Sequence, residues 1–571
     1  MSMKETLNIE TERVDDIPLL LAHMQHMNIA NLLDKHIPVH GNRKGLSHGS
    51  MIVVWLAHIL SEANHRMNHV QAWSERRRET IRRSGLISFD SLDMTDDRLA
   101  DGLRMLSSDV HWVAFEQELM GNLVRVYDMQ KECVRVDTTT AKSYAEVNEQ
   151  GLLQFGHSKD HRPDLGQLKI ALASLDPLGM PLATEVLSGE CADDPVYEPI
   201  IARVRDGLGK TGLLYVGDCK MAALQTRASI QCHRDFYLCP LSAVQVPPDQ
   251  MQKEVDKLKK QDIQVIKVEC VNDKGECVCI AQGYEISCDL AAEANGHREE
   301  WKERRFLIQS TSGAEGAKHS LLERLEKAEK AIQNILIRKQ GKMRVTDRME
   351  IDEAIQKIRE KFHVEGLLIA MVTEEIHEKS IRAYKGKPPE VRREVIYTVK
   401  CERNEKALAY AIGHLGWRVY ATNQKTGDMT LEQAVEAYRD EYRVERDFER
   451  LKGHPLSLAP LYVQRDDHRV GLVRLLTIAL RVLTLLEGVV RKNLKEQKKE
   501  LAGLYAGNPK RRTDQPTAEH LLKAFDEVTL TIVSTSAFIQ RHITQLSSLQ
   551  QEILSLLGFP PAIYSQLTDD S

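Results

Sequence analysis

Five short apolar runs between residues 132 and 241 have the length and composition of buried strands. They occupy residues 133–137, 168–175, 181–187, 212–218 and 236–239. Helical patterns separate the later runs: Asp194 and Pro195 are suited to begin a helix, and apolar residues then recur on one face at 196, 200, 204 and 208. Strands that alternate with helices predict a mixed or parallel α/β sheet.

Two of these runs end on an acidic residue, Asp137 in the first and Asp218 in the fourth. Open α/β sheets place their ligands at the carboxyl ends of the strands. If the first and fourth strands are neighbours, both carboxylates share one edge, where like charges repel unless a cation joins them. The pair therefore predicts a metal site, although each acid taken alone is also suited to cap a loop.

A polar turn at residues 156–164 lies between the first two strands and carries two histidines together with Lys159 and Arg162. Cationic side chains commonly surround phosphate sites, so we expect Lys159 and Arg162 to contact phosphates. An ordinary solvated hairpin has a similar composition, and the sequence leaves both interpretations open.

The pattern of residues 1–130 is helical and includes a buried helix at 51–60 that a preceding serine caps. An arginine run follows, which includes Arg76, Arg77 and Arg78. This run is either a solvated helix face or a surface that binds phosphates. Because the chain has a net charge of −5, any contact with nucleic acid has to come from such a local patch.

Past residue 241 the pattern changes to charged helices and strand-like segments, and a further strand signal near residue 416 marks a return to the first unit. The most apolar window, 470–490, carries three charged residues. Charges at the centre of a membrane are costly, so we expect a buried core helix here and no contact with a membrane.

The composition is that of a soluble globular protein with several domains: 571 residues, 42% hydrophobic and 28% charged, with a mean hydropathy of −0.37. No cationic leader with an apolar core begins the sequence, and ten cysteines without such a leader indicate reduced thiols. We therefore expect a cytoplasmic protein.

The segment 438–452 resembles a motif of a known family. Tyr438, Glu445 and Lys452 follow one another at intervals of seven residues, or two helical turns, so they share one face of a single helix. This spacing resembles the Tyr-Arg-Glu-Lys signature of bacterial insertion-sequence transposases, the DDE recombinases of the IS-four-like superfamily. The chain departs from the signature at Glu441, which stands where the family has arginine.

The resemblance extends well beyond this segment and is closest to the IS-sixteen-thirty-four group. It also includes the polar turn and five short segments: 45–47, 61–66, 137–139, 192–195 and 215–221. The likeness thus covers nearly the whole chain.

The resemblance implies an α/β fold: an RNase H-like mixed sheet core with helices on both sides, interrupted by a large α+β insertion and flanked by helical N- and C-terminal regions. The implied divisions are 1–130 for binding of DNA ends, 131–241 and 411–495 for the catalytic core, 242–410 for the insertion, and 496–571 for the helical C-terminal region.

The resemblance further implies that Asp137, Asp218 and Glu445 hold two Mg²⁺ or Mn²⁺ ions and catalyse phosphoryl transfer. Tyr438 and Lys452 would then contact DNA. The implied protein is a nucleoid-associated transposase, which cuts the ends of an insertion sequence and joins them to target DNA. Its partners would be double-stranded DNA, at the terminal inverted repeats and at the target, and a second copy of the chain. A metal-dependent nuclease without strand transfer and an inactive DNA-binding relative remain alternatives.

Overall fold

The structure is a computed structural model, and two compact units make up the chain. It describes residues 7–37, 45–85, 87–261, 263–271, 275–337, 347–381, 390–536 and 538–568. Unit 1 comprises Met1–Cys239, Leu290–Trp301 and Glu436–Ser571, and unit 2 comprises Pro240–Asp289 and Lys302–Val435. The chain therefore leaves unit 1 and returns to it, whereas the domain boundaries expected from the sequence stay predictions.

Unit 1 contains a mixed five-strand arrangement built from the five predicted apolar runs. Its strands are β2 (Cys133–Ser143), β3 (Gly166–Leu175), β4 (Met180–Ser188), β5 (Leu214–Gly217) and β6 (Phe236–Pro240). They lie in the order β4-β3-β2-β5-β6. β3 is antiparallel to β2 and β4, while β5 is parallel to β2 and β6. The prediction of a mixed sheet is confirmed.

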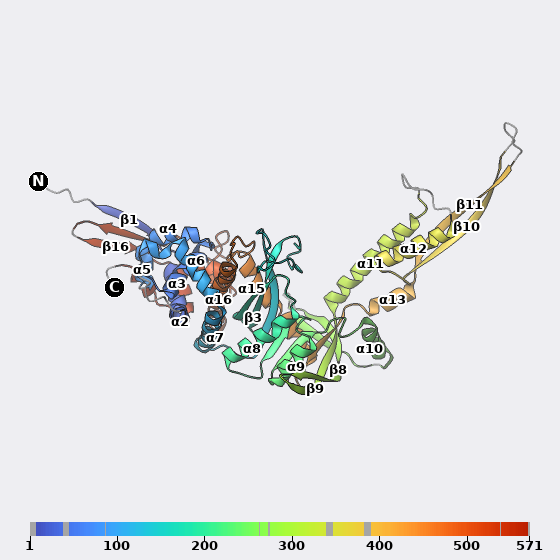
Figure 1. The fold of residues 1–571 in the computed structure, drawn as a ribbon, viewed down its shortest axis with the longest axis horizontal. Helices are drawn as coiled ribbons and strands as arrows, with labels where there is room; N and C mark the ends of the chain where they lie inside the picture. Colours follow the sequence, from blue (N-terminus) through green and yellow to red (C-terminus); the bar gives the residue numbers. More distant parts are fainter. Residues whose placement is uncertain are drawn as a thin grey trace. The chain divides into compact units, whose positions relative to one another are not determined.

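Helices pack against this sheet where the sequence predicts apolar faces. α8 (Tyr197–Leu208) follows a short 3-10 turn that begins at Asp194, and it buries Ile200, Val204 and Leu208. α9 (Leu224–Cys232) joins β5 to β6. α8 and α16 (Asp466–Gln497) contact β4, and α15 (Tyr442–Lys452) contacts β2 (Figure 1).

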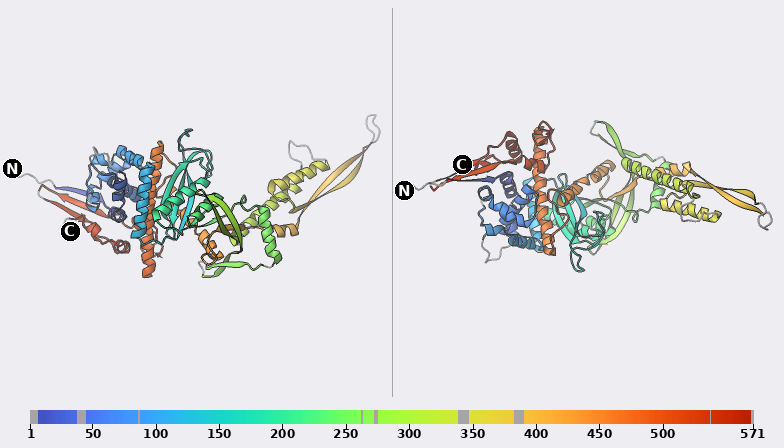
Figure 2. Two further views of the ribbon diagram at one scale, coloured as in Figure 1. Left: turned by 60° about the horizontal axis from the view of Figure 1, so that its bottom comes forward. Right: turned by 90° about the horizontal axis from the view of Figure 1, so that it is seen from above.

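The long helix α16 forms the centre of unit 1. It contains the apolar window 470–490, and most of its residues are buried, including the charged Arg474, Arg481 and Glu487. Figure 2 shows it, in orange, between the N-terminal helices in blue and the sheet in teal. The prediction of a buried core helix is confirmed. Among the described helices, none combines the length and the apolar composition needed to span a membrane.

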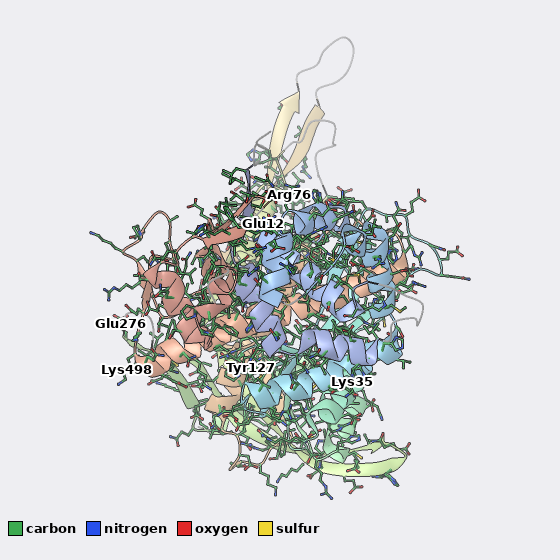
Figure 3. All side chains as sticks on the ribbon, turned by 90° about the vertical axis from the view of Figure 1, so that its left-hand side faces the viewer. Glu12, Lys35, Arg76, Tyr127, Glu276 and Lys498 are labelled. Carbon is green, nitrogen blue, oxygen red and sulfur yellow. The ribbon has the colours of Figure 1, made fainter. Side chains whose placement is uncertain are left out.

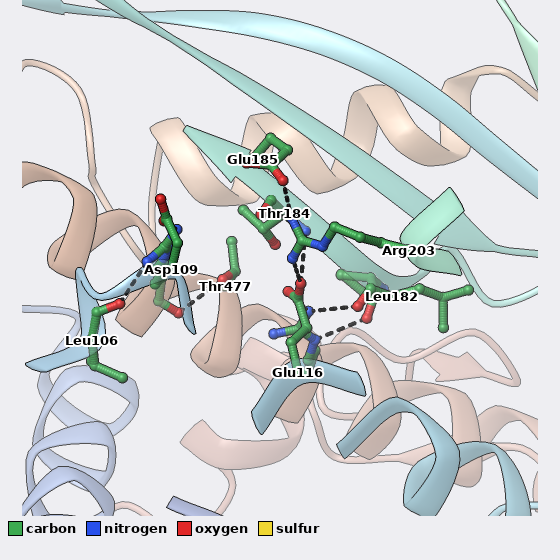
Figure 4. A network of polar contacts seen from close by, with 11 residues as sticks. Leu106, Asp109, Glu116, Leu182, Thr184, Glu185, Arg203 and Thr477 are labelled. Atoms are coloured by element: carbon green, nitrogen blue, oxygen red, sulfur yellow. Dashed lines mark hydrogen bonds and ion pairs between the residues drawn. The ribbon is translucent and has the colours of Figure 1, made fainter. Parts of the chain in front are cut away.

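Buried ion pairs compensate the charges of α16 (Figure 4). The Arg481 guanidinium pairs with Glu116 of α7 (Asp109–Val126) and donates to the backbone oxygens of Pro181, at 2.9 Å, and Leu182, at 3.0 Å. Arg203 of α8 pairs with the other Glu116 oxygen. Breaking any of these pairs would leave an isolated buried charge, which is strongly unfavourable. The network therefore ties α7, α8, α16 and β4 to one another.

The N-terminal region is mainly helical, as predicted. Its other helices are α1 (Ile17–His26), α2 (Ile29–His36), α3 (His48–Glu62), α4 (Val70–Glu75), α5 (Arg78–Gly85) and α6 (Asp96–Leu106). The expected serine cap is present, because the Ser47 hydroxyl accepts a hydrogen bond from the Ser50 N–H at 3.1 Å.

Both terminal regions also contain strands, which the expectation of helical terminal regions did not include. β1 (Asn8–Arg13) pairs antiparallel with β15 (Thr529–Ser534), which pairs with β16 (Ile539–Ile543). The remaining C-terminal elements are β13 (Leu501–Ala502), β14 (Arg512–Thr513), α17 (Ala518–Lys523), α18 (Ser548–Leu557) and α19 (Ala562–Ser565). Local patterns missed this sheet because its strands are short and its N- and C-terminal members are remote in sequence.

Unit 2 contains further strands and a helix-covered β-ribbon. β12 (Trp417–Thr422), β9 (His297–Ser310), β8 (Cys277–Ala294) and β7 (Ile266–Val271) are neighbours in that order. β10 (Leu368–Ile381) and β11 (Glu390–Arg403) form the ribbon. The helices are α10 (Pro248–Gln261), α11 (Thr311–Gln333), α12 (Arg348–Phe362), α13 (Glu405–Gly413) and α14 (Leu431–Arg439). The apolar faces of α11 and α12 are buried against each other and against the ribbon.

Candidate functional site

Asp137 and Asp218 lie on neighbouring parallel strands of unit 1. β2 and β5 pair in a register that places Val136 opposite Gly217. Asp137 directly follows Val136 in the chain, and Asp218 directly follows Gly217. β5 ends there, but β2 continues to Ser143 along β3, so Asp137 lies within its strand and not at its end as expected. The condition that the first and fourth strands are neighbours is therefore met.

Hydrogen bonds orient both carboxylates. The Tyr197 hydroxyl donates to Asp218 Oδ1 at 2.6 Å, and the Lys220 N–H donates to the same oxygen at 2.8 Å. Burial raises the pKa of Tyr197, and Asp218 adds to the rise, so this hydroxyl keeps its proton as a donor. Asp137 Oδ1 accepts from the Thr138 N–H at 2.7 Å.

The two acids and Lys159 form one electrostatic cluster. Lys159 Nζ lies 3.3 Å from Asp137 Oδ1 and also donates to the Thr138 oxygen. Burial raises the pKa of Asp137 and the Asp218 carboxylate adds to the rise, whereas Lys159 opposes it. Like-charged carboxylates in a partly buried position favour a compensating cation, and here the ammonium group supplies part of it.

Glu441, at the start of α15, faces the same cluster. Burial raises the pKa of its carboxyl group, and the Asp137, Glu445 and Asp218 carboxylates raise it further. A side-chain hydrogen bond with Tyr438 acts in the opposite direction. Glu445 lies one turn further along the helix and is exposed.

The segment 438–452 is two helices and not the single helix that the signature spacing implied. α14 ends at Arg439 and α15 begins at Tyr442, so Tyr438 lies on a different helix from Glu445 and Lys452. The N-terminal part of the signature therefore does not share a continuous helix face with the rest.

The polar turn is tied to the end of α15. Lys452 Nζ donates to Asp160 Oδ1 at 2.7 Å, which links the helix to the turn that carries Lys159. Arg162 lies on the same turn but forms an exposed ion pair with Asp164 at 2.7 Å. The structure thus brings Lys159 and Lys452 to one region, while contacts of Lys159, Arg162, Lys452 and Tyr438 with phosphates stay predictions.

Buried polar residues that the sequence did not single out hold α15 in place. Glu487 of α16 is buried and pairs with Arg446 at 2.7 Å, with Arg450, and with Arg491 at 2.8 Å. On the opposite side, the Ser174 hydroxyl of β3 donates to Asp447 Oδ2 at 2.8 Å. The sequence contains only a weak signal for them: Glu487 is a single acid in an apolar helix, and Arg446 and Arg450 are two cations four residues apart.

The acids provide only oxygen donors, which suits Mg²⁺ or Mn²⁺. Within the described ranges, no three histidine, cysteine, aspartate or glutamate side chains lie close enough together to hold a metal ion. The donor chemistry therefore fits a hard divalent cation, while Asp137, Asp218 and a glutamate of α15 as its ligands remain a proposal.

The arginine run of the N-terminal region is only partly exposed. Arg77 is buried, pairs with Glu62 at 2.9 Å and lies over the Trp73 ring at 5.0 Å. Its charge is thus compensated inside the protein, and its assignment to DNA stays a prediction. Arg76 and Arg78 are exposed, and their assignment to DNA stays a prediction.

One cavity of unit 1 lies away from the strand acids. It has a volume of about 1040 Å³ and lies between α3, its following loop and the segment after α15. Arg66, Arg465 and His468 are part of its lining, whereas Asp137, Asp218, Glu441 and Glu445 are not.

Comparisons with known proteins include a weak structural likeness. No protein-family model matches the chain, and no curated protein matches it. Among solved structures, the chain is similar to a piggyBac transposase synaptic complex with hairpin DNA, at 7% identity and a TM-score of 0.35. The match covers 96% of this chain and 83% of that one. At this TM-score the likeness does not establish a shared fold.

Proposed function

We propose that the protein is a DNA transposase that cuts the ends of an insertion sequence and joins them to target DNA by metal-dependent phosphoryl transfer. The observation that carries the proposal is the pairing of β2 with β5, which brings Asp137 and Asp218 together. The five strands lie side by side in the order β4-β3-β2-β5-β6, so the first strand in the sequence, β2, is in the middle. The second strand in the sequence, β3, is antiparallel to it. This is the order expected of an RNase H-like core.

In this proposal Asp137, Asp218 and Glu445 hold two Mg²⁺ or Mn²⁺ ions. Bound ions of this kind activate an attacking oxygen and stabilise the leaving oxygen of an in-line displacement. The protein's own contribution is orientation. Tyr197 and the Lys220 N–H fix the Asp218 carboxylate, and the ion pairs of Glu487 hold α15 against α16.

Cations near the acids suit the binding of a DNA phosphate. Lys159 contacts Asp137, and Lys452 contacts Asp160 on the same turn. When a metal ion compensates Asp137, the Lys159 ammonium group becomes available for a phosphate, and Lys452 lies on the neighbouring helix end. Tyr438 contributes a hydroxyl group beside Glu441.

The proposed partners are duplex DNA at the element's inverted repeats and at the target, and a second copy of the chain. Paired ends require two active sites, one for each end, which a homodimer provides. Arg76 and Arg78, both exposed, are candidates for phosphate contacts next to the ends. A protein with this role would be associated with the DNA of the nucleoid.

The test is an assay of cleavage and joining with the full-length chain and DNA that flanks its gene, which would carry the inverted repeats. With Mg²⁺ we expect cut 3′ ends and their covalent joining to a labelled target duplex. Asp137→Asn and Asp218→Asn should each abolish both products and leave DNA binding unchanged. Asp160→Asn, which removes the negative charge that pairs with Lys452, is the matched control and should retain cleavage.

Each alternative predicts a different product. Cleavage without joined products would identify a nuclease. Binding without cleavage, in Mg²⁺ and in Mn²⁺, would identify an inactive relative. Unchanged cleavage in Asp137→Asn and Asp218→Asn would place the reaction elsewhere.

A further inference from the structure

Residues 492–515, at the end of α16 and just beyond it, are strongly basic in a chain of net charge −5. They contain seven cations against three acids. All seven side chains are exposed: Lys492, Lys495, Lys498, Lys499, Lys510, Arg511 and Arg512. We call these seven residues the C-terminal basic surface. Figure 3 labels Lys498 among them, at the end of α16.

The fold brings the two halves of this surface together. α16 ends at Gln497, with Lys498 in a left-handed conformation that turns the chain. β13 then begins at Leu501 and pairs with β14, so that Ala502 lies opposite Arg512. The lysines at the helix end and the cations at 510–512 therefore share one part of unit 1, although a loop separates them in sequence.

Neighbouring contacts make this surface a fixed one. Arg491 donates to the Pro516 oxygen at 2.9 Å, and Asn493 donates to the Leu556 oxygen at 2.7 Å. The Arg511 guanidinium lies 4.1 Å from the centre of the Tyr505 ring, and that ring contacts His520. Stacking of this kind limits the freedom of a cation before it meets a ligand.

These cations have no carboxylate partner within the described ranges, unlike Arg77 and Arg82 of the N-terminal region. Arg77 pairs with Glu62, and Arg82 pairs with Glu79. Lysines at a helix C-terminus also stabilise the helix dipole, which accounts for Lys495 alone in the last turn. The cations at 498–499 and 510–512 lie outside the helix, so the dipole does not explain them.

The chemistry of the surface favours a nucleic-acid backbone over a membrane or an apolar protein partner. No large apolar side chain is exposed between residues 492 and 515, all of which the structure describes. Membrane-surface segments bury an apolar face, and stable protein interfaces contain apolar or aromatic anchors. Contacts with phosphates need cations alone.

We propose that the C-terminal basic surface binds the phosphate backbone of duplex DNA outside the cleavage site. The choice of DNA over other polyanions rests on the proposed function, while the existence of an anion-binding surface does not. Contacts of this kind add affinity without sequence preference.

The experiment measures binding of the full-length chain to a random-sequence duplex as a function of salt concentration. The test variant combines Lys495→Gln, Lys498→Gln, Arg511→Gln and Arg512→Gln. The matched control combines Lys318→Gln, Lys327→Gln, Lys330→Gln and Lys357→Gln, which are exposed positions on α11 and α12 with the same change of net charge. Circular dichroism checks that both variants are folded.

Each phosphate contact contributes about 0.9 to the slope of log K against log salt concentration. We expect the test variant to lower this slope by about two to four, with affinity at low salt reduced more than tenfold, and the control to keep the wild-type slope. Equal slopes in the test variant and the control would overturn the proposal. So would a wild-type chain that binds anionic phosphatidylserine vesicles more tightly than duplex DNA.

A parallel assay of Mg²⁺-dependent cleavage separates this proposal from the proposed function. A lowered slope without any cleavage by the wild type would retain the DNA surface and reject the transposase. Cleavage by the wild type with an unchanged slope in the test variant would retain the transposase and reject the surface.

Discussion

Two glutamates of neighbouring turns, Glu441 and Glu445, compete for the role of third acid. The signature spacing from Tyr438 to Lys452 assigns Glu445, whereas the Glu441 carboxylate interacts with both strand acids. We expect Glu445→Gln to lose metal-dependent cleavage and Glu441→Gln to retain it, because Gln keeps the shape and removes a repelling charge. Cleavage assays of both variants at equal protein concentration check this. The reverse result would make Glu441 the third acid.

Asp447 gives a prediction about the dependence of stability on pH. Burial raises its pKa to about 8, although Ser174 and two arginines oppose the rise. The unfolded-state pKa is about 3.9, so the protonated carboxyl group stabilises the fold fully below that value. This stabilisation is lost as the pH rises through about 8.

Asp447→Asn, which mimics the protonated acid, should therefore raise the melting temperature above that of the wild type. The difference should grow between pH 5 and pH 8, and thermal unfolding at several pH values measures it. The exposed Asp514→Asn is the control and should show no such trend. A difference for Asp447→Asn that stays constant with pH would contradict the assigned protonation.

At the residue scale, the sequence indicated Asp137 and Asp218 because each follows a recognisable apolar strand. It did not indicate Asp447 or Glu487, since an acid becomes a buried anchor only through partners that the fold supplies. The same holds for Arg77: the sequence shows only an arginine run, whereas the structure shows Glu62 and Trp73 around this residue.

At the level of elements, one glycine marks a close approach of two helices. A Cβ atom at Gly471 of α16 would lie 2.1 Å from the Leu103 oxygen of α6. We expect Gly471→Ala to destabilise the protein by about 1–3 kcal/mol, because the helices would have to separate. Chemical denaturation monitored by circular dichroism measures this.

Gly316 of α11 is the matched control, since a Cβ atom there meets nothing within 4 Å. Gly316→Ala should stabilise its helix by up to about 1 kcal/mol, because alanine has the higher helix propensity. Two equal effects of the same sign would contradict the close approach of α6 and α16.

The strands of the central sheet and the helix α16 were predictable because their patterns are local and repeat over several residues. The break between α14 and α15 was not, because no proline or glycine marks Asp440 and Glu441. β1 was also missed, since its sequence AsnIleGluThrGluArg has little apolar content and its partner lies near the C-terminus.

For the whole molecule, the N-terminal region depends on the C-terminal one. α16 packs against α6, where Leu99, Leu103 and Leu106 are buried. The Tyr564 hydroxyl donates to the Asp15 oxygen at 2.9 Å. Residues 1–130 alone would expose these surfaces to water.

We therefore expect a fragment of residues 1–130 to be unfolded or aggregated when produced alone. Coexpression with residues 131–571 should recover a soluble complex. Size-exclusion chromatography and circular dichroism distinguish the two states. A monomeric fragment with cooperative thermal unfolding would show that the region is an independent domain.

The pairing of β1 with β15 has a consequence for synthesis on the ribosome. β1 ends at Arg13 and its partner begins at Thr529, so at about 5–20 residues per second the first strand waits roughly half a minute to two minutes for it. An apolar strand left unpaired for so long would recruit other nascent chains. The charged residues of β1, Glu10, Glu12 and Arg13, oppose such pairing while the rest of the chain is translated.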